Sequence, residues 1–116
     1  MQKINLHFNA FYLGELTFDG EYYNFKIDEE STKMLIKAGV NVATFEANKK
    51  EVLSKNLPIV FKNFLPNTTE KVEMLEDLGI FKTDSDFEKL IKISKLKLSK
   101  DKFWLESKNW LIFLNW

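Results

Sequence analysis

Apolar and polar side chains alternate along the first part of the chain. From Ile4 to Phe18 every even position holds an apolar residue or glycine, while many odd positions are polar. A period of two is typical of β-strands that bury one face. Asn9 and Ala10 could form a tight turn within this run, because asparagine tolerates positive φ. The run is therefore expected to be a hairpin of two strands.

A second turn signal extends the predicted sheet. The pair Asp19-Gly20 is the preferred sequence for a two-residue hairpin loop. Alternation over residues 23–27 predicts a third strand, which completes an antiparallel meander. A fourth strand is predicted over residues 40–45, followed by an exposed polar loop with one helical turn at residues 50–54.

The apolar segment 57–65 separates these strands from the helices that follow. Pro58 fits the first turn of a helix, where its missing N–H costs no hydrogen bond. Pro66 disfavours helical backbone at Leu65, so the helix must end there. The segment is expected to be a short buried helix. Residues 28–36 could add a short helical turn earlier in the chain.

Two amphipathic helices are predicted after this segment. The first covers residues 69–78, with Asn67 or Thr68 as its N-cap. The second begins after Asp84 or Ser85, which are also good N-cap residues. Their inner stripes are Val72, Leu75 and Leu78 in the first helix, and Phe87, Leu90, Ile91 and Ser94 in the second.

Beyond residue 95 the period of two returns. Residues 103–105 and 110–116 are predicted to form the last strands, and the second of these is apolar on both faces. No repeat or linker divides the chain, so residues 1–116 are expected to form one domain. The pattern predicts an α+β fold: a small, curved antiparallel β-sheet of five or six strands with two or three short α-helices.

The composition argues against catalysis. His7 is the single histidine and cysteine is absent, so neither a histidine cluster nor a cysteine metal site can be built. The serines lack a nucleophile-elbow pattern, and the four glycines do not form a phosphate-binding loop. We therefore expect no enzyme activity, no cofactor and no metal ion.

Charge and hydropathy bear on the partners and the location of the protein. The 17 basic residues are all lysines and balance 17 acidic residues, so no global field attracts nucleic acid. Lysine also lacks the planar fork with which arginine binds phosphates and guanine edges. The N-terminus shows no signal peptide, and no apolar run approaches the length of a membrane span. A cytoplasmic protein without membrane or direct nucleic-acid contact is expected.

Two features near the C-terminus could bind a partner. The lysine-rich residues 89–102 could form a weak anion surface, although an ordinary solvated helix face is the favoured interpretation. Three tryptophans lie in the last 13 residues, and tryptophan is enriched at binding hot spots. They either close the core or leave a ring exposed to a partner. The candidate partner-binding residues are Phe103, Trp104 and Trp110.

A resemblance to a known family rests on residues 60–67, Val-Phe-Lys-Asn-Phe-Leu-Pro-Asn. They resemble the Phe-Phe-Asp/Glu-Asn-Leu-Leu-Pro-Glu/Asp motif in the N-terminal subdomain of HipA-type serine/threonine kinases. Residues 9–16 are similar to the first hairpin of that subdomain, and residues 86–90 to a helix start. The motif residues in this chain are Phe61, Asn63, Phe64, Leu65 and Pro66, of which Phe64 is an apolar replacement; Lys62 and Asn67 lose the acidic character of the motif.

The chain carries no kinase motif and looks like a HipS-type antitoxin, the free-standing form of this subdomain in HipB–HipS–HipT toxin–antitoxin systems. The resemblance implies that it binds and inhibits a HipT-like serine/threonine kinase, while a HipB-like protein binds DNA. The motif at residues 61–66 is expected mainly to hold the fold, with Asn63 hydrogen-bonded to backbone. Two alternatives are a non-inhibitory subdomain that bridges the kinase and a HipB-like protein, and a small nucleic-acid-binding barrel.

Overall fold

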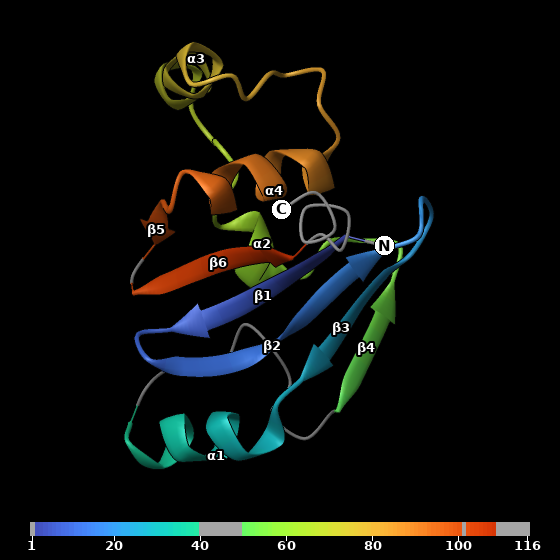
Figure 1. Ribbon diagram of the computed structural model, residues 1–116, viewed down its shortest axis with the longest axis vertical. Coiled ribbons are helices and arrows are strands. Elements are labelled where there is room, and N and C mark those ends of the chain that lie inside the picture. Colours follow the sequence, from blue (N-terminus) through green and yellow to red (C-terminus); the bar gives the residue numbers. More distant parts are fainter. Residues whose placement is uncertain (1, 40–49, 101, 109–116) are drawn as a thin grey trace, which may run out of the picture.

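The computed structural model describes residues 2–39, 50–100 and 102–108, and Figure 1 shows how their elements are arranged. In chain order these are β1 (Lys3–Phe8), β2 (Phe11–Phe18), β3 (Tyr23–Ile27), α1 (Glu29–Lys37), β4 (Glu51–Ser54), α2 (Ile59–Lys62), α3 (Thr69–Asp77), α4 (Asp86–Lys95), β5 (Ser99–Lys100) and β6 (Phe103–Lys108). The predicted α+β fold class is confirmed. The described residues contain four helices instead of two or three, because α1 is a full helix rather than a single turn. The strands predicted over residues 40–45 and 110–116 lie outside the described residues.

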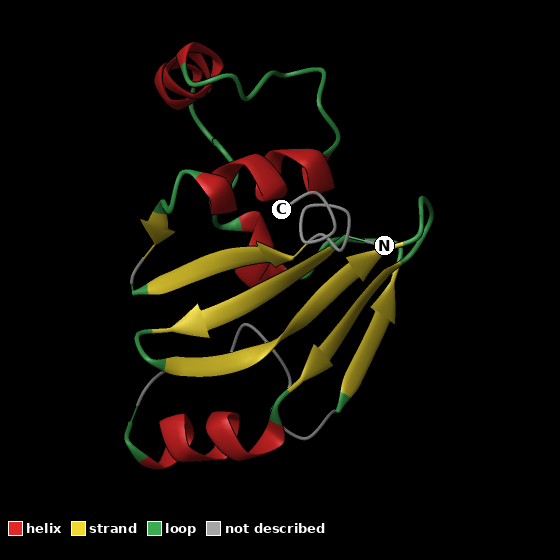
Figure 2. Ribbon diagram, in the orientation of Figure 1, coloured by secondary structure: helices red, strands yellow, loops and turns green. Residues whose placement is uncertain are grey.

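The described strands form one antiparallel sheet in the order β4-β3-β2-β1-β6-β5. β1 lies between β2 and β6, so the first and last strands of the described chain are neighbours. Figure 2 shows the strands as a twisted fan with α1 at one end and the other helices towards the opposite end. β4 and β5 are the two edges of the sheet. The described residues therefore form an open sheet and not a closed barrel.

The turns of the meander differ in how well the sequence predicted them. The turn between β1 and β2 lies at Asn9, as expected, and Asn9 adopts a φ of 49°. The β2–β3 loop is longer than the predicted two-residue turn. The Oδ1 atom of Asp19 accepts hydrogen bonds from the backbone N–H groups of Glu21 and Tyr22 at 2.8 and 2.7 Å. This carboxylate holds residues 19–22 in an Asx-type loop.

A β-bulge in β2 interrupts the predicted alternation. Leu6 pairs with Gly14, but the next residue, His7, pairs with Tyr12, so Leu13 is an extra residue in β2. Beyond the bulge the faces are exchanged, and Leu13 is buried while Tyr12 is exposed. Tyr12 consequently lies on the same face as His7 and not on the apolar face.

Residues 51–54, where a helical turn was expected, form strand β4. Within β4, Val52 lies opposite Phe25 of β3 and packs against the core. The pairing also provides partners for the backbone groups on the outer side of β3. Such a short segment has too little pattern to distinguish helix from strand, so the tertiary pairing decides its conformation.

The helices α2 and α4 form the core with one face of the sheet. On α2, Phe61 is fully buried, and its ring meets Phe25 of β3 edge to face at a centroid distance of 5.0 Å. Ser85 caps α4 as predicted, with its Oγ atom accepting a hydrogen bond from the Glu88 N–H at 3.2 Å. The predicted inner stripe of α4 is buried in full: Phe87, Leu90, Ile91 and Ser94.

The helix α3 is the least embedded of the helices. Thr68 is its N-cap as predicted, and the Thr68 Oγ1 atom accepts a hydrogen bond from the Lys71 N–H at 3.2 Å. Of the predicted inner stripe, Leu75 is buried, Val72 is half-buried and Leu78 is exposed. Figure 1 shows the reason: α3 lies beyond α4, away from the sheet. The prediction that Leu78 faces the core is therefore wrong.

Candidate functional site

The predicted partner-binding residues do not form one patch. Phe103 and Trp104 are consecutive in β6, so their side chains point to opposite faces of the sheet. Phe103 packs against the core, where its ring meets Phe8 at a centroid distance of 5.0 Å. Trp110 lies outside the described residues. Of the two candidates within the described strand, Trp104 is the one that lies on the face away from the core.

Trp104 is held in an aromatic group on that outer face. Its ring stacks on His7 of β1, with centroids 4.0 Å apart and planes 9° from parallel. The Trp104 Nε1–H donates a hydrogen bond to the Asn9 carbonyl oxygen at 2.8 Å. Tyr12 meets the edge of the His7 ring at 5.7 Å. Because one indole face is covered and the N–H is satisfied, Trp104 has only part of its surface left for a partner.

Carboxylates lie near two members of this aromatic group, His7 and Tyr12. The His7 Nε2 atom lies 3.4 Å from the Glu106 Oε1 atom. Burial raises the pKa of the Tyr12 hydroxyl, and the carboxylates of Glu15 and Asp28 raise it further. Tyr12 therefore stays neutral and keeps its hydroxyl proton at physiological pH. The arrangement offers stacking and hydrogen bonding, and it does not provide an activated nucleophile.

The residues of the family motif occupy three different environments. Phe61 lies in the core, whereas Phe64, Leu65 and Pro66 are half-buried. Asn63 is exposed at the end of α2, where its backbone N–H donates to the Ile59 carbonyl oxygen at 3.1 Å. Within the part of the chain that the structure describes, the Asn63 side chain forms no hydrogen bond. The expected side-chain bond from Asn63 to backbone is therefore not observed.

Leu65 and Pro66 line two neighbouring hollows. The first, of about 140 Å³, is completed by the apolar residues Val72, Ile80 and Phe81 and by the charged residues Lys82, Asp86 and Lys89. The second, of about 210 Å³, is completed mainly by the side chains Phe64, Met74, Leu75, Ile93 and Leu98. Both are bordered by apolar and polar residues of α3 and α4 or of the segments that flank these helices. The second half of the motif thus lies at the surface between these helices.

Phe81 lines the first hollow and Met74 the second, and Leu78 is exposed one helical turn after Met74. Met74 is 54% exposed, Leu78 48% and Phe81 50%. Met74 and Leu78 are four residues apart on α3 and therefore share one side of the helix. We name Leu65, Pro66, Met74, Leu78 and Phe81 the Pro66 surface. This surface was not predicted from the sequence: Leu78 was expected to face the core, and Met74 and Phe81 were not assigned to a surface.

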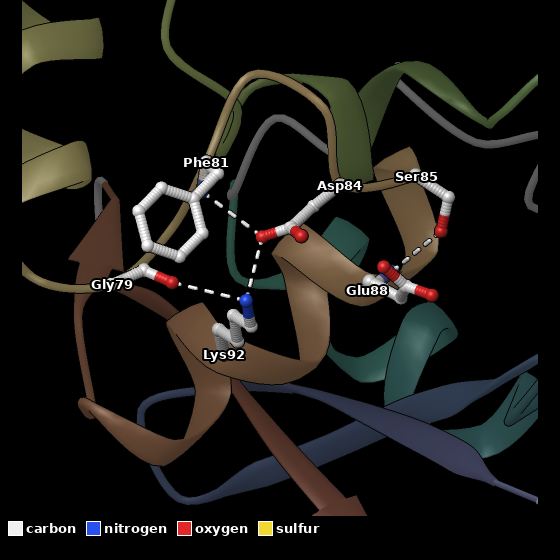
Figure 3. A network of polar contacts seen from close by, with 6 residues as sticks. All are labelled: Gly79, Phe81, Asp84, Ser85, Glu88 and Lys92. Atoms are coloured by element: carbon white, nitrogen blue, oxygen red, sulfur yellow. Dashed lines mark hydrogen bonds and ion pairs between the residues drawn. The ribbon is translucent and has the colours of Figure 1, made fainter.

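A polar network holds the loop that joins α3 to α4 (Figure 3). The Lys92 Nζ atom of α4 donates hydrogen bonds to the Gly79 carbonyl oxygen at 3.0 Å and to the Asp84 Oδ2 atom at 2.7 Å. The same Oδ2 atom accepts a hydrogen bond from the Phe81 N–H at 3.0 Å. The ammonium group also lies 5.1 Å from the centroid of the Phe81 ring. Lys92 therefore positions Phe81 at the Pro66 surface.

This network gives a prediction for the pH dependence of stability. The hydrogen bond from Lys92, followed by the bond from the Phe81 N–H, lowers the pKa of Asp84 below its ordinary value of 3.8. A lowered pKa in the folded state stabilises the protein above the unfolded-state pKa, and this stabilisation is lost as pH falls through the folded-state pKa. We expect Asp84→Asn to be less stable than the wild type at pH 7, with a difference that shrinks below about pH 4. Urea unfolding of both proteins at a series of pH values measures this difference in the free energy of unfolding.

The control for this experiment is Asp77→Asn, which removes an exposed carboxylate at the end of α3. Asp77 forms no hydrogen bond or ion pair with its side chain in the described part of the chain, so its replacement should not lower the free energy of unfolding at pH 7. A deficit of Asp84→Asn that stays constant down to pH 2 would contradict the assignment of the network to the ionised carboxylate.

The described ranges contain neither a metal-binding cluster nor a membrane-spanning helix. There, no three or more histidine and acidic side chains gather in a way that could hold a metal ion. None of the helices described has the length and apolar character needed to cross a membrane. A scan against protein-family models gave no match for the chain, and a search of curated proteins found no similar sequence.

Proposed function

We propose that this chain is a HipS-type antitoxin that binds a HipT-like serine/threonine kinase and inhibits it by protein–protein contact. The resemblance of residues 60–67 to the HipA-type motif suggests the partner. The observation that carries the proposal is the Pro66 surface, where the end of this motif meets exposed apolar side chains of α3 and the α3–α4 loop.

An exposed apolar surface of this kind supports a binding function. Contiguous apolar patches on monomeric proteins are small, and larger ones mark interaction sites. Phe81 lines the first hollow and Met74 the second, and both hollows could receive side chains of a partner. Aromatic and methionine side chains are enriched at the centres of such interfaces. A subdomain that packs beside a kinase in a larger protein would need an apolar contact surface of this type.

In this proposal the chain inhibits the kinase by binding to its surface and not by a chemical reaction. The chain would dock beside the nucleotide cleft of the kinase and block a productive conformation or access of the substrate. Trp104 could add to the interface, although it lies on the outer face of the sheet with its N–H already bonded to Asn9. Phe103 packs against the core and is not proposed as an interface residue. Phe81 is the aromatic residue that we expect to contact the kinase instead. The proposal places the chain in the cytoplasm together with the kinase.

The experiment is autophosphorylation of a purified HipT-like kinase with and without the chain. A micromolar excess of wild type should suppress phosphorylation. The double variant Met74→Lys/Leu78→Lys should inhibit about tenfold less well or worse, because it places two charges in an apolar interface. Both side chains are exposed, so the substitutions should leave the fold intact.

A matched control is Met34→Lys/Ile36→Lys on α1, where both side chains are also exposed. Figure 1 places α1 at the end of the molecule opposite α3. This variant should inhibit as well as the wild type. Unchanged kinase activity at micromolar excess of wild type would reject the inhibitor role, and equal loss in both double variants would reject the Pro66 surface.

A bridging subdomain that does not inhibit is the second candidate. It is favoured by the separate exposed apolar residues on α1, since a bridge needs two surfaces. That second surface is smaller, because Met34 and Ile36 are two positions apart and point in different directions on the helix. A pull-down with a HipB-like protein alone distinguishes the candidates. Binding that is lost in Met34→Lys/Ile36→Lys would support the bridge.

A nucleic-acid-binding role has less support. The described sheet has two free edges instead of the closed barrel that this alternative assumed. Two lysines of the basic stretch, Lys89 and Lys92, lie 4.0 and 2.7 Å from the carboxylates of Asp86 and Asp84. Their charge is therefore partly neutralised within the chain. Salt-dependent binding to single-stranded nucleic acid would restore this alternative.

A further inference from the structure

The outer edge of β6 is only partly covered. The short strand β5 pairs with two residues of β6, Phe103 and Trp104. β6 continues to Lys108, and beyond Trp104 no described strand lies next to it on that side. Figure 1 shows β5 as a short arrow beside the beginning of β6. No strand of the described residues therefore covers the rest of this edge, which can accept an added strand.

The hydrogen-bond pattern shows which backbone groups face this edge. The Asn9 N–H donates to the Lys102 carbonyl oxygen at 3.0 Å, which makes these two residues a hydrogen-bonded pair of the β1–β6 ladder. Such pairs alternate along an antiparallel ladder, so Trp104 and Glu106 direct their backbone groups towards β1. The N–H and C=O groups of Leu105 and Ser107 consequently point outward.

A groove of about 660 Å³ lies along these outward-facing groups. One wall is formed by residues 104–107 of β6, and the other by Ser94, Lys95 and Lys97 at the end of α4. Ser99, the first residue of β5, lies opposite Trp104, the last residue of β6 that β5 covers. A strand of four residues spans about 13 Å, which matches the open part of the edge. The groove therefore lies beside the part of β6 that β5 does not cover.

The charges of this groove favour an acidic occupant. Lys95 and Lys97 are both exposed, and neither forms an ion pair within the described residues. Lysines beside a free edge discourage pairing between identical copies, because the two copies would bring like charges together. The same lysines attract a strand that carries carboxylates. Glu106, the acidic side chain in the wall, lies 3.4 Å from His7 on the outer face of the sheet.

We propose that the β6 edge groove, formed by residues 94–99 and 104–107, binds an extended acidic segment of a partner protein as an added β-strand. The segment donates and accepts backbone hydrogen bonds at Leu105 and Ser107, and its carboxylates meet Lys95 and Lys97. Strand addition of this kind takes its affinity from the main chain and its specificity from alternate side chains. None of these residues belongs to the Pro66 surface, although Ser99 lines both this groove and the second hollow beside Pro66. Lys95, Lys97, Leu105 and Ser107, on which the test depends, line neither hollow.

The test begins with short random peptides displayed on phage and selected against the purified chain. We expect the recovered peptides to be rich in Asp and Glu that alternate with β-branched residues. Binding to Lys95→Glu/Lys97→Glu should be weaker by about tenfold or more, because charge complementarity becomes repulsion. The matched control Lys33→Glu/Lys37→Glu reverses two exposed lysines of α1 and should bind as the wild type does.

Amide hydrogen exchange then tests the added strand directly. The Leu105 and Ser107 amides should become protected when the selected peptide binds, and N-methylation of the peptide at alternate residues should abolish binding. Ser107→Pro should also abolish it, since proline removes an outward-facing N–H and is tolerated at a free edge. Recovery of no acidic peptides, undiminished binding to Lys95→Glu/Lys97→Glu, or protection elsewhere in the chain would each overturn the proposal.

Discussion

Replacement of Gly14 by alanine should lower the free energy of unfolding by about 3 kcal/mol or more. Gly14 lies in β2, where a Cβ atom would be 2.6 Å from the Phe25 Cε1 atom and closer still to the Lys26 carbonyl oxygen. Phe25 is fully buried, and β2 is bonded on both sides by β1 and β3. Neither the ring nor the backbone of β3 can move away without loss of other contacts. The glycine is required here by lack of space and not by its φ.

Urea unfolding followed by circular dichroism measures this effect. The control is Gly79→Asn, at a position just after α3 where φ is +87° and no atom would contact an added Cβ. Asparagine tolerates left-handed backbone, so the control should cost about 1 kcal/mol or less. If Gly14→Ala were as stable as Gly79→Asn, the close approach of β3 to β2 in this structure would be wrong.

The sequence predicted the local elements that have a strong period. Strands β1, β2 and β3 follow from alternation, and α4 follows from its stripe and its cap at Ser85. These signals can be read from each segment alone, because the apolar side chains that define its period are also the ones that become buried. The bulge at Leu13 could not be predicted in this way, since one extra residue shifts the register without a change in composition.

Long-range pairing was the part of the fold that the sequence could not give. Strand β4 exists because residues 51–54 pair with β3, and the position of β1 depends on its pairing with β6. For the candidate site, the alternation in β6 already implied that Phe103 and Trp104 face opposite ways. The Pro66 surface required the position of α3 relative to α4, which is a tertiary feature, as is the contact between Asp84 and Lys92 in the loop that joins these helices.

Truncation of Phe61 to alanine should cost about 3–5 kcal/mol of the free energy of unfolding, a large part of the total of about 5–15 kcal/mol that such domains have. Phe61 is fully buried, and its ring packs edge to face on Phe25. The helix α2 has only four residues, too few to be stable alone, so its position depends on this side chain and on Val60. Loss of the ring leaves a cavity beneath the motif.

The matched control for Phe61 lies in the same helix. Ile59 is 59% exposed, and Ile59→Ala should cost less than about 1 kcal/mol, because little apolar area is removed from the core. Phe61→Leu keeps most of the buried volume and should fall between the two alanine variants. Urea unfolding of the three proteins at one pH gives the comparison. Equal stability of Phe61→Ala and Ile59→Ala would mean that the aromatic ring of the motif does not hold the fold, and that its place in the core of this structure is incorrect.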